Sequence, residues 1–495
     1  MTPSETSPLL AEQSPQTRQK HHRHHHDVPP DFSPSSGESL CLPPGDEAVA
    51  SEECKLLLTR SAPLIVTFLL EYSFTAASIF AVGHIGKIEL AATAVAGLTA
   101  NITGYAIYQG LATSLDTLCP SAYGAGRKDL VGLYCQRMTC FLWFMTIPIA
   151  AIWLCADRLL KLFIQPEIAR MAGLYLRVLV LGAPGYAAFE CGKRFMLAQG
   201  LFSATVWVLI LCAPLNAVLN YLFVWTFNWG FLGAPMAVVI AQTLMPVILA
   251  VYITCIAGSE CWNGFTRSVF HGWWPMVRLA LPGMVMVEAE LLAWELLTLA
   301  SSFISVEHLA AQSTIATLGA IAFNFHFPIS IAAATRISTL IGAGHADAAK
   351  RAAKVSILTA FVFGILVAIL LGTLRNQLPA LFTENPDVIH FVSAVLPMVG
   401  VSQVFDSLAT SCNGLLRGLG KQNVGSVTAL FCYYGVGIPI SFALAFWFHW
   451  DLLGLAVGTT LALLLVALIE GAFMATTHWE RIVEEASMRN EPTVS

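Results

Sequence analysis

Charged residues are scarce in this chain. Only 12% of its 495 residues are Asp, Glu, Lys or Arg, whereas 56% are hydrophobic, and a typical soluble domain is about 25% charged. Such a composition argues against an ordinary soluble domain and indicates a membrane protein. We therefore expect the lipid bilayer as its surroundings and no nucleic-acid partner.

Motifs of catalytic and metal sites are missing from the sequence as well. The twelve cysteines form no CxxC pair and no His/Cys cluster, so we interpret them as small packed apolar residues rather than disulfides or metal ligands. There is no HExxH or GxSxG motif, and the two Gly-Ala-Gly segments lack the GK[ST] ending of a phosphate-binding loop. We expect no enzyme activity, no cofactor and no metal site.

Long apolar runs, in contrast, are abundant. Each is long enough to cross a ~30 Å hydrocarbon core as a helix, and we predict twelve, near 57–80, 92–114, 132–154, 172–190, 203–226, 231–257, 276–300, 309–333, 353–374, 391–411, 425–448 and 452–476. Membrane β-barrels use alternating strands of about ten residues, which these runs do not resemble. The predicted fold class is an all-α polytopic membrane protein with twelve transmembrane helices.

The first 55 residues are different in character. They are rich in Ser, Pro, His and Glu and contain no apolar leader, which predicts a disordered cytoplasmic tail without a cleaved signal peptide. The HHRHHH run at 21–26 could bind metal or titrate near pH 6.5, but we interpret it as a solvated low-complexity run. ETSPLLA at 5–11 resembles an acidic-dileucine sorting signal, so a vacuolar or endosomal membrane and the plasma membrane both stay open.

The basic residues are unevenly distributed along the predicted loops. With both termini in the cytoplasm, 20 of the 26 Lys and Arg lie in cytoplasmic segments, including Lys193, Arg194, Arg336 and Arg417. The other six are Lys87, Arg158, Lys161, Arg170, Arg177 and Arg375. The excess of cytoplasmic positive charge favours N-in and C-in termini, with residues 478–495 as a cytoplasmic C-terminal tail.

The two halves of the apolar region repeat each other at an offset of 218 to 220 residues. The matching landmarks are Pro63 and Pro282, Leu90-Ala91-Ala92 and Leu309-Ala310-Ala311, Gly-Ala-Gly at 124–126 and 342–344, and Gly200 and Gly420. We predict a six-helix lobe at 56–257, an inter-lobe loop at 258–275 and a second six-helix lobe at 276–477. Because six is even, this is a parallel repeat about an axis along the membrane normal, which favours a carrier over a channel, receptor or intramembrane enzyme.

Five motifs, taken in order, resemble one transporter family. They are GLATSLDTLCPSAYGAGRKDLVGLYCQR (110–137), RFMLAQG (194–200), NAVLNYLF (216–223), SIAAATRISTLIGAGHADAAK (330–350) and SCNGLLRGLGKQNVG (411–425). The chain resembles the multidrug and toxic compound extrusion (MATE) family in its eukaryotic form over roughly residues 55 to 475. The resemblance implies an antiporter that exports organic cations, drugs or toxic metabolites in exchange for protons or sodium.

Ionisable residues inside the apolar runs are the candidate transport residues. Each costs at least ~2.5–3.5 kcal/mol to insert at mid-membrane, so its default interpretation is functional. The second lobe contains Glu288, Glu290, Glu295, His326 and Asp406, and the first contains Glu71, which follows Pro63 by eight residues as Glu290 follows Pro282. Asp116, Glu190 and Glu470 lie nearer helix ends, where structural pairing or capping is at least as good an explanation.

Two arguments disagree about the three glutamates of VEAELLAWE (287–295). At 100° per residue, Glu288 and Glu295 lie on one helix face and Glu290 points about 140° away from Glu295. The resemblance instead implies that Glu290 and Glu295, five residues apart, are the functional pair, with Asp406 on another helix. A bulge or kink in this helix would reconcile the two.

Other candidates keep two interpretations each. Asn101 matches a polar position of the family and either lines a central cavity or bonds a neighbouring helix. His326 either titrates in the cavity or packs as a hydrogen-bonded histidine. Four aromatic residues either form a wall that binds a cation or pack in the core: Trp294, Phe323, Phe325 and Phe327. Leu291 and Leu292 stand where the family usually has two tryptophans, which leaves the substrate contacts open.

The expected mechanism is competition for buried carboxylates. Apolar surroundings and neighbouring like charges favour the protonated form of a carboxylic acid, so a site can hold either protons or a cationic cargo. Rocking of the lobes would then carry protons and cargo across the membrane in turn. We expect the protein to work as a monomer. Sodium coupling and a related flippase for lipid-linked or anionic metabolites are the alternatives, although the latter would favour arginine in the cavity.

Overall fold

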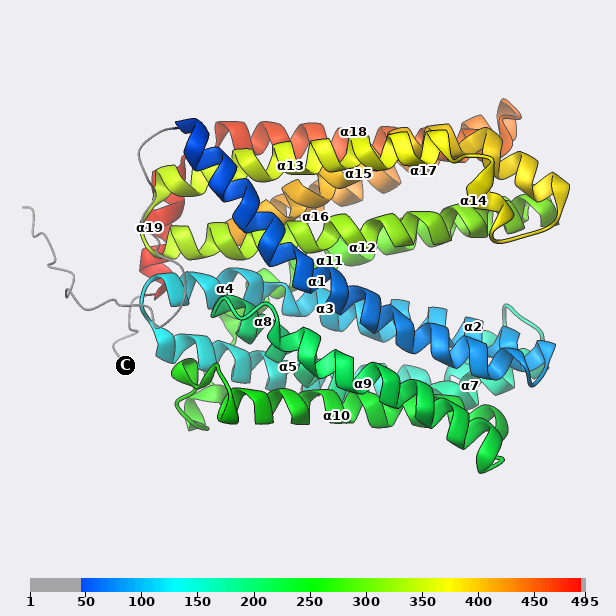
Figure 1. Ribbon diagram of the computed structural model, residues 1–495, viewed down its shortest axis with the longest axis horizontal. Helices are drawn as coiled ribbons and strands as arrows, with labels where there is room; N and C mark the ends of the chain where they lie inside the picture. Colours follow the sequence, from blue (N-terminus) through cyan, green and yellow to red (C-terminus); the bar gives the residue numbers. More distant parts are fainter. Residues whose placement is uncertain (1–45, 491–495) are drawn as a thin grey trace, which may run out of the picture. The chain divides into compact units, whose positions relative to one another are not determined.

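The computed structural model describes residues 46–490, in which every element of secondary structure is a helix (Figure 1). Its first half, the N-lobe, contains α1 (Asp46–Gly83), α2 (Lys87–Ala100), η1 (Asn101–Tyr105), α3 (Ala106–Ala112), α4 (Ser114–Gly124), α5 (Lys128–Leu154), α6 (Ala156–Leu160), α7 (Pro166–Leu179), α8 (Ala183–Ala198), α9 (Ala204–Tyr221), η2 (Leu222–Thr226), η3 (Gly230–Leu232) and α10 (Gly233–Cys255). The inter-lobe segment carries η4 (Ser259–Cys261) and η5 (Arg267–Phe270).

The second half, the C-lobe, has the same plan. It contains α11 (Trp274–Ser302), α12 (Val306–Gly342), α13 (Ala346–Thr373), α14 (Gln377–Ala380), α15 (Pro386–Leu419), α16 (Gln422–Ala429), η6 (Leu430–Gly437), α17 (Ile438–Phe442), η7 (Ala443–Trp447) and α18 (Asp451–Thr476). A final helix, α19 (Trp479–Asn490), follows it. The elements η1, η2, η6 and η7 are π-helical turns inside longer helices.

The predicted membrane architecture is confirmed in its main features. Within the described residues, ten helices are long and apolar enough to span a bilayer, and the bent pair α7 and α8 would make an eleventh. The remaining long helix, α11, has 29 residues and carries Arg278 and the three glutamates. Every 18-residue window of α11 therefore holds at least three charged residues, which explains why composition alone does not identify it as a span.

The ends of the chain depart from the prediction in one respect. Helix α1 begins at Asp46, so residues 46–55 are helical and do not belong to a disordered tail. Glu53, in this first part of α1, is buried and pairs with Arg336 on α12. The histidine run at 21–26 and the dileucine segment at 5–11 lie outside the described residues.

Backbone geometry confirms the internal repeat. Residues with positive φ recur in pairs 218 to 221 residues apart: Gly126 and Gly344, Gly200 and Gly420, Asn228 and His449, and Gly230 and Asp451. The π-turns η2 and η7 are separated by the same interval. A left-handed residue after a helix satisfies the last carbonyl groups and redirects the chain, so both lobes turn at equivalent places.

Local sequence explains where the helices begin. Ser305 accepts a hydrogen bond from the backbone N–H of His308 and so caps α12. Asn385 caps α15 in the same way through the N–H of Asp387, and Pro386 occupies the first helical position, where a missing N–H costs nothing. These caps fix the starts of the two helices that carry His326 and Asp406.

Candidate functional site

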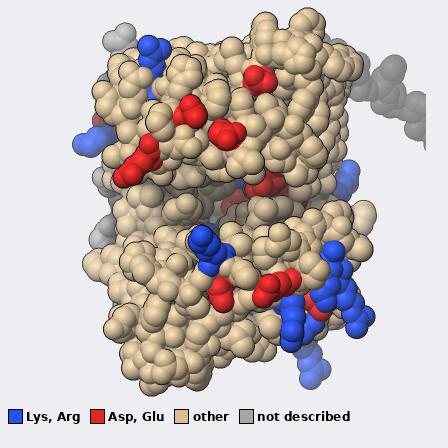
Figure 2. Space-filling view, turned by 90° about the vertical axis from the view of Figure 1, so that its right-hand side faces the viewer, with Lys and Arg blue, Asp and Glu red and all other residues tan. Residues whose placement is uncertain are grey.

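Among the described residues, the two lobes enclose a hollow that is open at one end and closed at the other. Figure 2 looks at the end opposite α19 and shows the hollow between the lobes, with acidic side chains inside it. At the other end, where α1 begins and α19 lies (Figure 1), helices α4, α12 and α15 bring the lobes into contact. We call these the open end and the closed end.

At the closed end, the backbones of the two lobes approach each other closely. A Cβ on Gly124 would overlap the carbonyl of Thr339, and one on Gly342 would overlap the carbonyl of Ser121, so glycine is required at both positions. These glycines belong to the repeated Gly-Ala-Gly segments. The two halves of the repeat thus contact each other through the same residue type.

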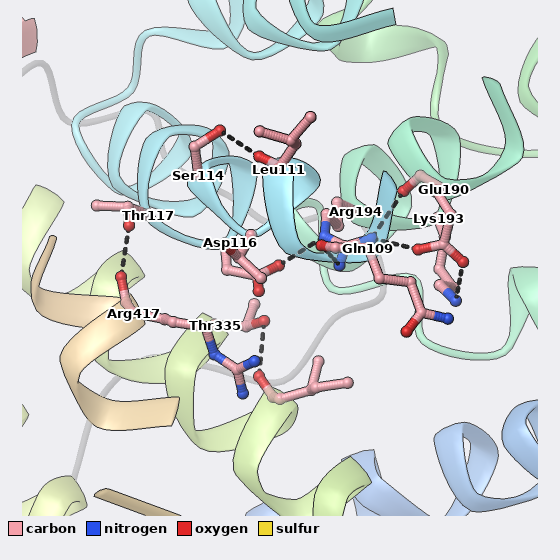
Figure 3. Close-up of polar contacts among 12 residues, drawn as sticks. Gln109, Leu111, Ser114, Asp116, Thr117, Glu190, Lys193, Arg194, Thr335 and Arg417 are labelled. Atoms are coloured by element: carbon pink, nitrogen blue, oxygen red, sulfur yellow. Dashed lines mark hydrogen bonds and ion pairs between the residues drawn. The ribbon is translucent and has the colours of Figure 1, made fainter. Parts of the chain in front are cut away.

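Thr117 on α4 connects the lobes at the centre of this contact. Its hydroxyl donates to the carbonyl of Arg417 at 2.5 Å and accepts from the Gln422 amide at 2.8 Å, while its own carbonyl accepts from Ser338 at 2.7 Å. Figure 3 shows the bond between Thr117 and Arg417. One N-lobe residue therefore bonds three C-lobe helix segments.

Two further contacts hold the closed end at its edges. Glu53, on the first turns of α1, forms a bidentate ion pair with Arg336 on α12 at 2.8 and 3.1 Å, and both side chains are buried. At the end of α19, the amide of Asn490 donates to the carbonyl and hydroxyl of Ser121 at 3.3 and 3.1 Å. The carbonyl of Asn490 accepts from Arg127 at 3.0 Å.

In the N-lobe, every candidate acid has a basic partner. Glu71 on α1 accepts from the Lys193 ammonium at 3.0 Å, and the same ammonium donates to Glu190 at 2.7 Å. Arg194 bonds the second oxygen of Glu190 and lies 3.2 Å from Asp116. Figure 3 shows how Arg194 bridges α4 and α8. Three carboxylates here share two cations.

Three acids of the C-lobe form a cluster near Arg417. Glu290 on α11, Asp406 on α15 and Glu470 on α18 interact electrostatically, and Arg417 is the cation that acts on Glu290 and Glu470. Asp406, Glu470 and Arg417 are each at most 4% exposed. Within residues 46–490, the Glu290 carboxylate has no hydrogen bond or ion pair. The charge of this cluster is therefore balanced only in part.

Neutral or titratable side chains complete the C-lobe cluster. The His326 ring nitrogen Nε2 lies 3.5 Å from the Asp406 carboxylate, and His326 is 3% exposed. With its amide nitrogen turned toward Glu470, Asn413 donates to both carboxylate oxygens at 3.0 and 3.2 Å. Arg417 donates to Ser330 at 3.1 Å.

Helix α11 is regular through all three glutamates, and no bulge lies in it. The helical angle therefore holds: Glu288 and Glu295 share a face, and Glu290 points elsewhere, into the cluster with Asp406. The π-turn lies in the opposing segment η6 instead, where Tyr433 interacts with Glu290 and Tyr434 with Glu288. One Glu288 oxygen is buried without a hydrogen-bond partner among the described residues.

The remaining predicted residues are dispersed. Asn101 is exposed at the start of the π-turn η1. Trp294 borders a small apolar cavity between α11, α17 and α18 that Tyr433 also lines. Of the three phenylalanines, Phe323 stacks on Phe327, over which the Arg417 guanidinium lies at 5.3 Å from the ring centroid, whereas Phe325 is exposed.

Four basic residues have a different role from the one that the sequence suggested. Lys193, Arg194, Arg336 and Arg417 were assigned to cytoplasmic segments, but their side chains are at most 11% exposed and bond other buried groups. A signal for two of them was available, because Lys193 and Arg194 follow Glu190 by three and four residues, the spacing of helical ion pairs. For Arg417 and Asn413 the sequence offered no such signal.

Comparison with known proteins agrees with this architecture. The MatE family model matches the chain twice, at residues 63–222 and 282–443. The uncharacterized transporter YDR338C of Saccharomyces cerevisiae is 42% identical over 89% of this chain, which spans 64% of that relative. Mouse multidrug and toxin extrusion protein 2 is 32% identical over 88% of this chain and 77% of its own length.

A solved structure gives the same result. The eukaryotic MATE transporter AtDTX14 superimposes with a TM-score of 0.85 at 27% identity, covering 89% of this chain and all of that one. The twofold match of the family model coincides with the two lobes, and its start points lie at Pro63 and Pro282. The chain belongs to the MatE family of multidrug and toxic compound extrusion transporters, and to its eukaryotic type.

Proposed function

We propose that this transporter is a secondary active antiporter that exports organic cations in exchange for protons by alternating access. The observation that carries the proposal is the C-lobe cluster, in which Glu290 interacts with Asp406 and Glu470, and Arg417 is the cation that acts on Glu290 and Glu470 among the described residues. An unbalanced buried carboxylate is costly, so it favours either a proton or a cationic cargo. The two cargoes compete for the same negative charge.

In this mechanism Glu290 and Asp406 bind the proton. His326, 3.5 Å from Asp406, provides a nitrogen through which a proton can reach or leave that carboxylate. Glu288 and Glu295, on the other face of α11, attract the cation, and we assign to Trp294 and Asn101 an aromatic and a polar contact with it. Glu71 stays neutralised by Lys193 in the N-lobe wall.

The closed end supplies the alternating access. The described conformation exposes the hollow at one end, and the contacts of Thr117, Glu53 and Asn490 separate it from the other. Transport requires a second conformation in which these contacts open and the opposite end closes. Protonation of the cluster removes the charge that retains the cation, so cargo leaves at the acidic side.

We propose that the closed end faces the cytoplasm. Of the 20 basic residues first assigned to that side, three lie in the tail before residue 46 and four are buried, which leaves thirteen against six at the open end. The excess still follows the positive-inside rule. The open end then faces the exterior or the lumen of an acidic organelle, whose identity the proposal leaves to localisation experiments.

Proteoliposomes test the proposal. Purified protein is reconstituted, and uptake of a labelled organic cation such as tetraethylammonium is followed under an imposed pH gradient, a sodium gradient, or both. We expect accumulation driven by the pH gradient and unaffected by sodium. Accumulation driven by sodium alone would replace protons with sodium as the coupling ion, and no accumulation under either gradient would contradict cation antiport.

A further inference from the structure

The internal repeat identifies which residues occupy equivalent places in the two lobes. Glu71 and Glu290 each follow, by eight residues, a proline inside a helix, Pro63 in α1 and Pro282 in α11. Because helical rise and turn are fixed, an equal spacing from an equivalent proline puts the two carboxylates at the same place in each lobe. Glu71 and Glu290 are therefore structural counterparts.

The same reasoning pairs Lys193 with Asn413. Each precedes, by seven residues, a glycine with positive φ: Gly200 at 77° after α8 and Gly420 at 73° after α15. Equivalent backbone bonds close both helix ends, from residue 201 to 196 at 3.0 Å and from residue 421 to 416 at 2.9 Å. Lys193 and Asn413 therefore lie at equivalent positions of their helices, relative to Gly200 and Gly420.

Lys193 and Asn413 differ in charge, and this difference decides whether the nearby carboxylate has a cationic partner. In the N-lobe, the Lys193 ammonium lies between Glu71 at 3.0 Å and Glu190 at 2.7 Å and is 4% exposed. In the C-lobe, the neutral Asn413 amide bonds Glu470, and no ion pair forms at Glu290 within the described residues. The same place therefore holds a cation in one lobe and none in the other.

We propose that Lys193 is a tethered cation that permanently occupies, in the N-lobe, the place that a transported cation or proton takes in the C-lobe, and that Asn413 keeps the C-lobe place free. An ammonium on a side chain satisfies a buried carboxylate as an exchangeable cation would, but it cannot leave. Residues 193 and 413 thereby determine which lobe exchanges cations and how many are exchanged in each cycle.

The charged surroundings of both places are consistent with this assignment. Around Lys193 lie Glu71 on α1, Glu190 and Arg194 on α8, and Asp116 on α4 through Arg194. Around the C-lobe place lie Glu290 on α11, Asp406 and Arg417 on α15, Glu470 on α18, His326 on α12 and Tyr433 on η6. Arg417 also interacts with Asp116 of the N-lobe group. The N-lobe group is therefore short of at most one positive charge, whereas the C-lobe group with neutral His326 is short of at least two.

This inference rests on the proposed antiport, so wild-type protein is measured first. In proteoliposomes with a fixed pH difference, Asn413→Lys is compared with Asn413→Gln, which alters size but adds no charge. We expect pH-driven accumulation of tetraethylammonium to fall at least tenfold further in Asn413→Lys than in Asn413→Gln, because the new ammonium can bridge Glu290 and Glu470. Size-exclusion profiles and melting temperatures establish that both variants are folded.

A second variant tests the N-lobe. Lys193→Asn frees Glu71, so one more proton should be exchanged per cycle, and the accumulation ratio at equilibrium should rise about tenfold for each unit of pH difference. Adding Glu71→Gln to this variant should bring the ratio back down. These ratios are independent of the amount of active protein, so partial loss of folded material does not affect them.

The outcomes separate the inference from the proposed function. If wild-type protein accumulates no cation under any gradient, the antiport proposal fails, and this inference fails with it. If wild-type protein is active but Asn413→Lys matches Asn413→Gln, or Lys193→Asn keeps the wild-type ratio, the antiport proposal stands and the tethered-cation assignment is overturned.

Discussion

The ion pair between Glu53 and Arg336 should control how readily the closed end opens. Both side chains are at most 8% exposed, and the pair is bidentate at 2.8 and 3.1 Å. Replacing Glu53 with Gln leaves the guanidinium buried without its counter-ion, which typically costs about 3–5 kcal/mol. Opening of the closed end would expose Arg336 to water and relieve this cost.

The variant should therefore favour the conformation in which the closed end has opened and the open end has closed. A relief of about 3 kcal/mol changes the ratio of the two conformations by about a hundredfold, enough to bring a state populated at 1% to about half. Dissolved salt screens this ion pair only weakly, because both side chains are shielded from solvent. Its effect should therefore appear as a conformational shift more than as a salt-dependent loss of stability.

Distance measurements can detect this shift. Spin labels on exposed residues 161, in the N-lobe, and 375, in the C-lobe, report the width of the open end. The labels are best attached through unnatural amino acids, because the chain has twelve cysteines. In Glu53→Gln we expect a new population at shorter distance, whose share grows at the expense of the wild-type peak.

The control breaks an ion pair inside one lobe. Asp157 pairs with Arg177 at 2.9 Å within the N-lobe, so Asp157→Asn should leave the distance distribution unchanged. If Glu53→Gln also leaves it unchanged while both proteins remain folded, the ion pair does not hold the closed end shut, and its proposed role is wrong.

Three further predictions concern the same framework. Gly124→Ala should prevent tight closure, because its Cβ would overlap the Thr339 carbonyl, and a new population at shorter spin-label distance should appear as in Glu53→Gln. Asn490→Ala removes two hydrogen bonds to Ser121, worth about 1–3 kcal/mol together, and should speed hydrogen–deuterium exchange in α19 while the rest of the chain keeps its protection. Arg194→Met leaves two buried acids without this partner and should lower the melting temperature sharply, reflecting a loss of about 3–5 kcal/mol.

The helices and the repeat could be predicted because they depend on local or periodic features. Apolar runs identify the spans, and Pro63, Pro282, Gly200 and Gly420 mark equivalent bends and turns in each lobe. Such positions are constrained by backbone geometry, which a sequence reveals directly. The internal offset was therefore visible before any contact was known.

The buried basic residues could not be placed in this way. Helices α12 and α15 have 37 and 34 residues, or about 50–55 Å at 1.5 Å per residue, whereas the hydrocarbon core is about 30 Å thick. A charge near the end of such a helix can meet solvent or the interior of the protein. Arg336 and Arg417 lie in these regions, and only packing against α1 and α4 shows that both are buried.

The grouping of the acids likewise required three-dimensional contacts. The helical angle puts Glu288 and Glu295 on one face of the regular helix α11, but the partners of Glu290 come from α15 and α18, more than 110 residues later in the chain. The bulge or kink that would put Glu290 and Glu295 on one face is absent from α11, and the π-turn η6 lies in a different segment. Separate helices thus supply the two sides of the site, and no local pattern links them.

The most direct test of the account is the behaviour of Glu290→Gln in proteoliposomes. Two assays are run on the same preparation: accumulation of labelled tetraethylammonium driven by a pH gradient, and exchange of labelled for unlabelled cation at equal pH. If the Glu290 carboxylate couples protons to cargo, the first should fall to background while measurable exchange persists, because the remaining acids still attract the cation. Accumulation equal to that of the wild type would contradict the central role of this carboxylate.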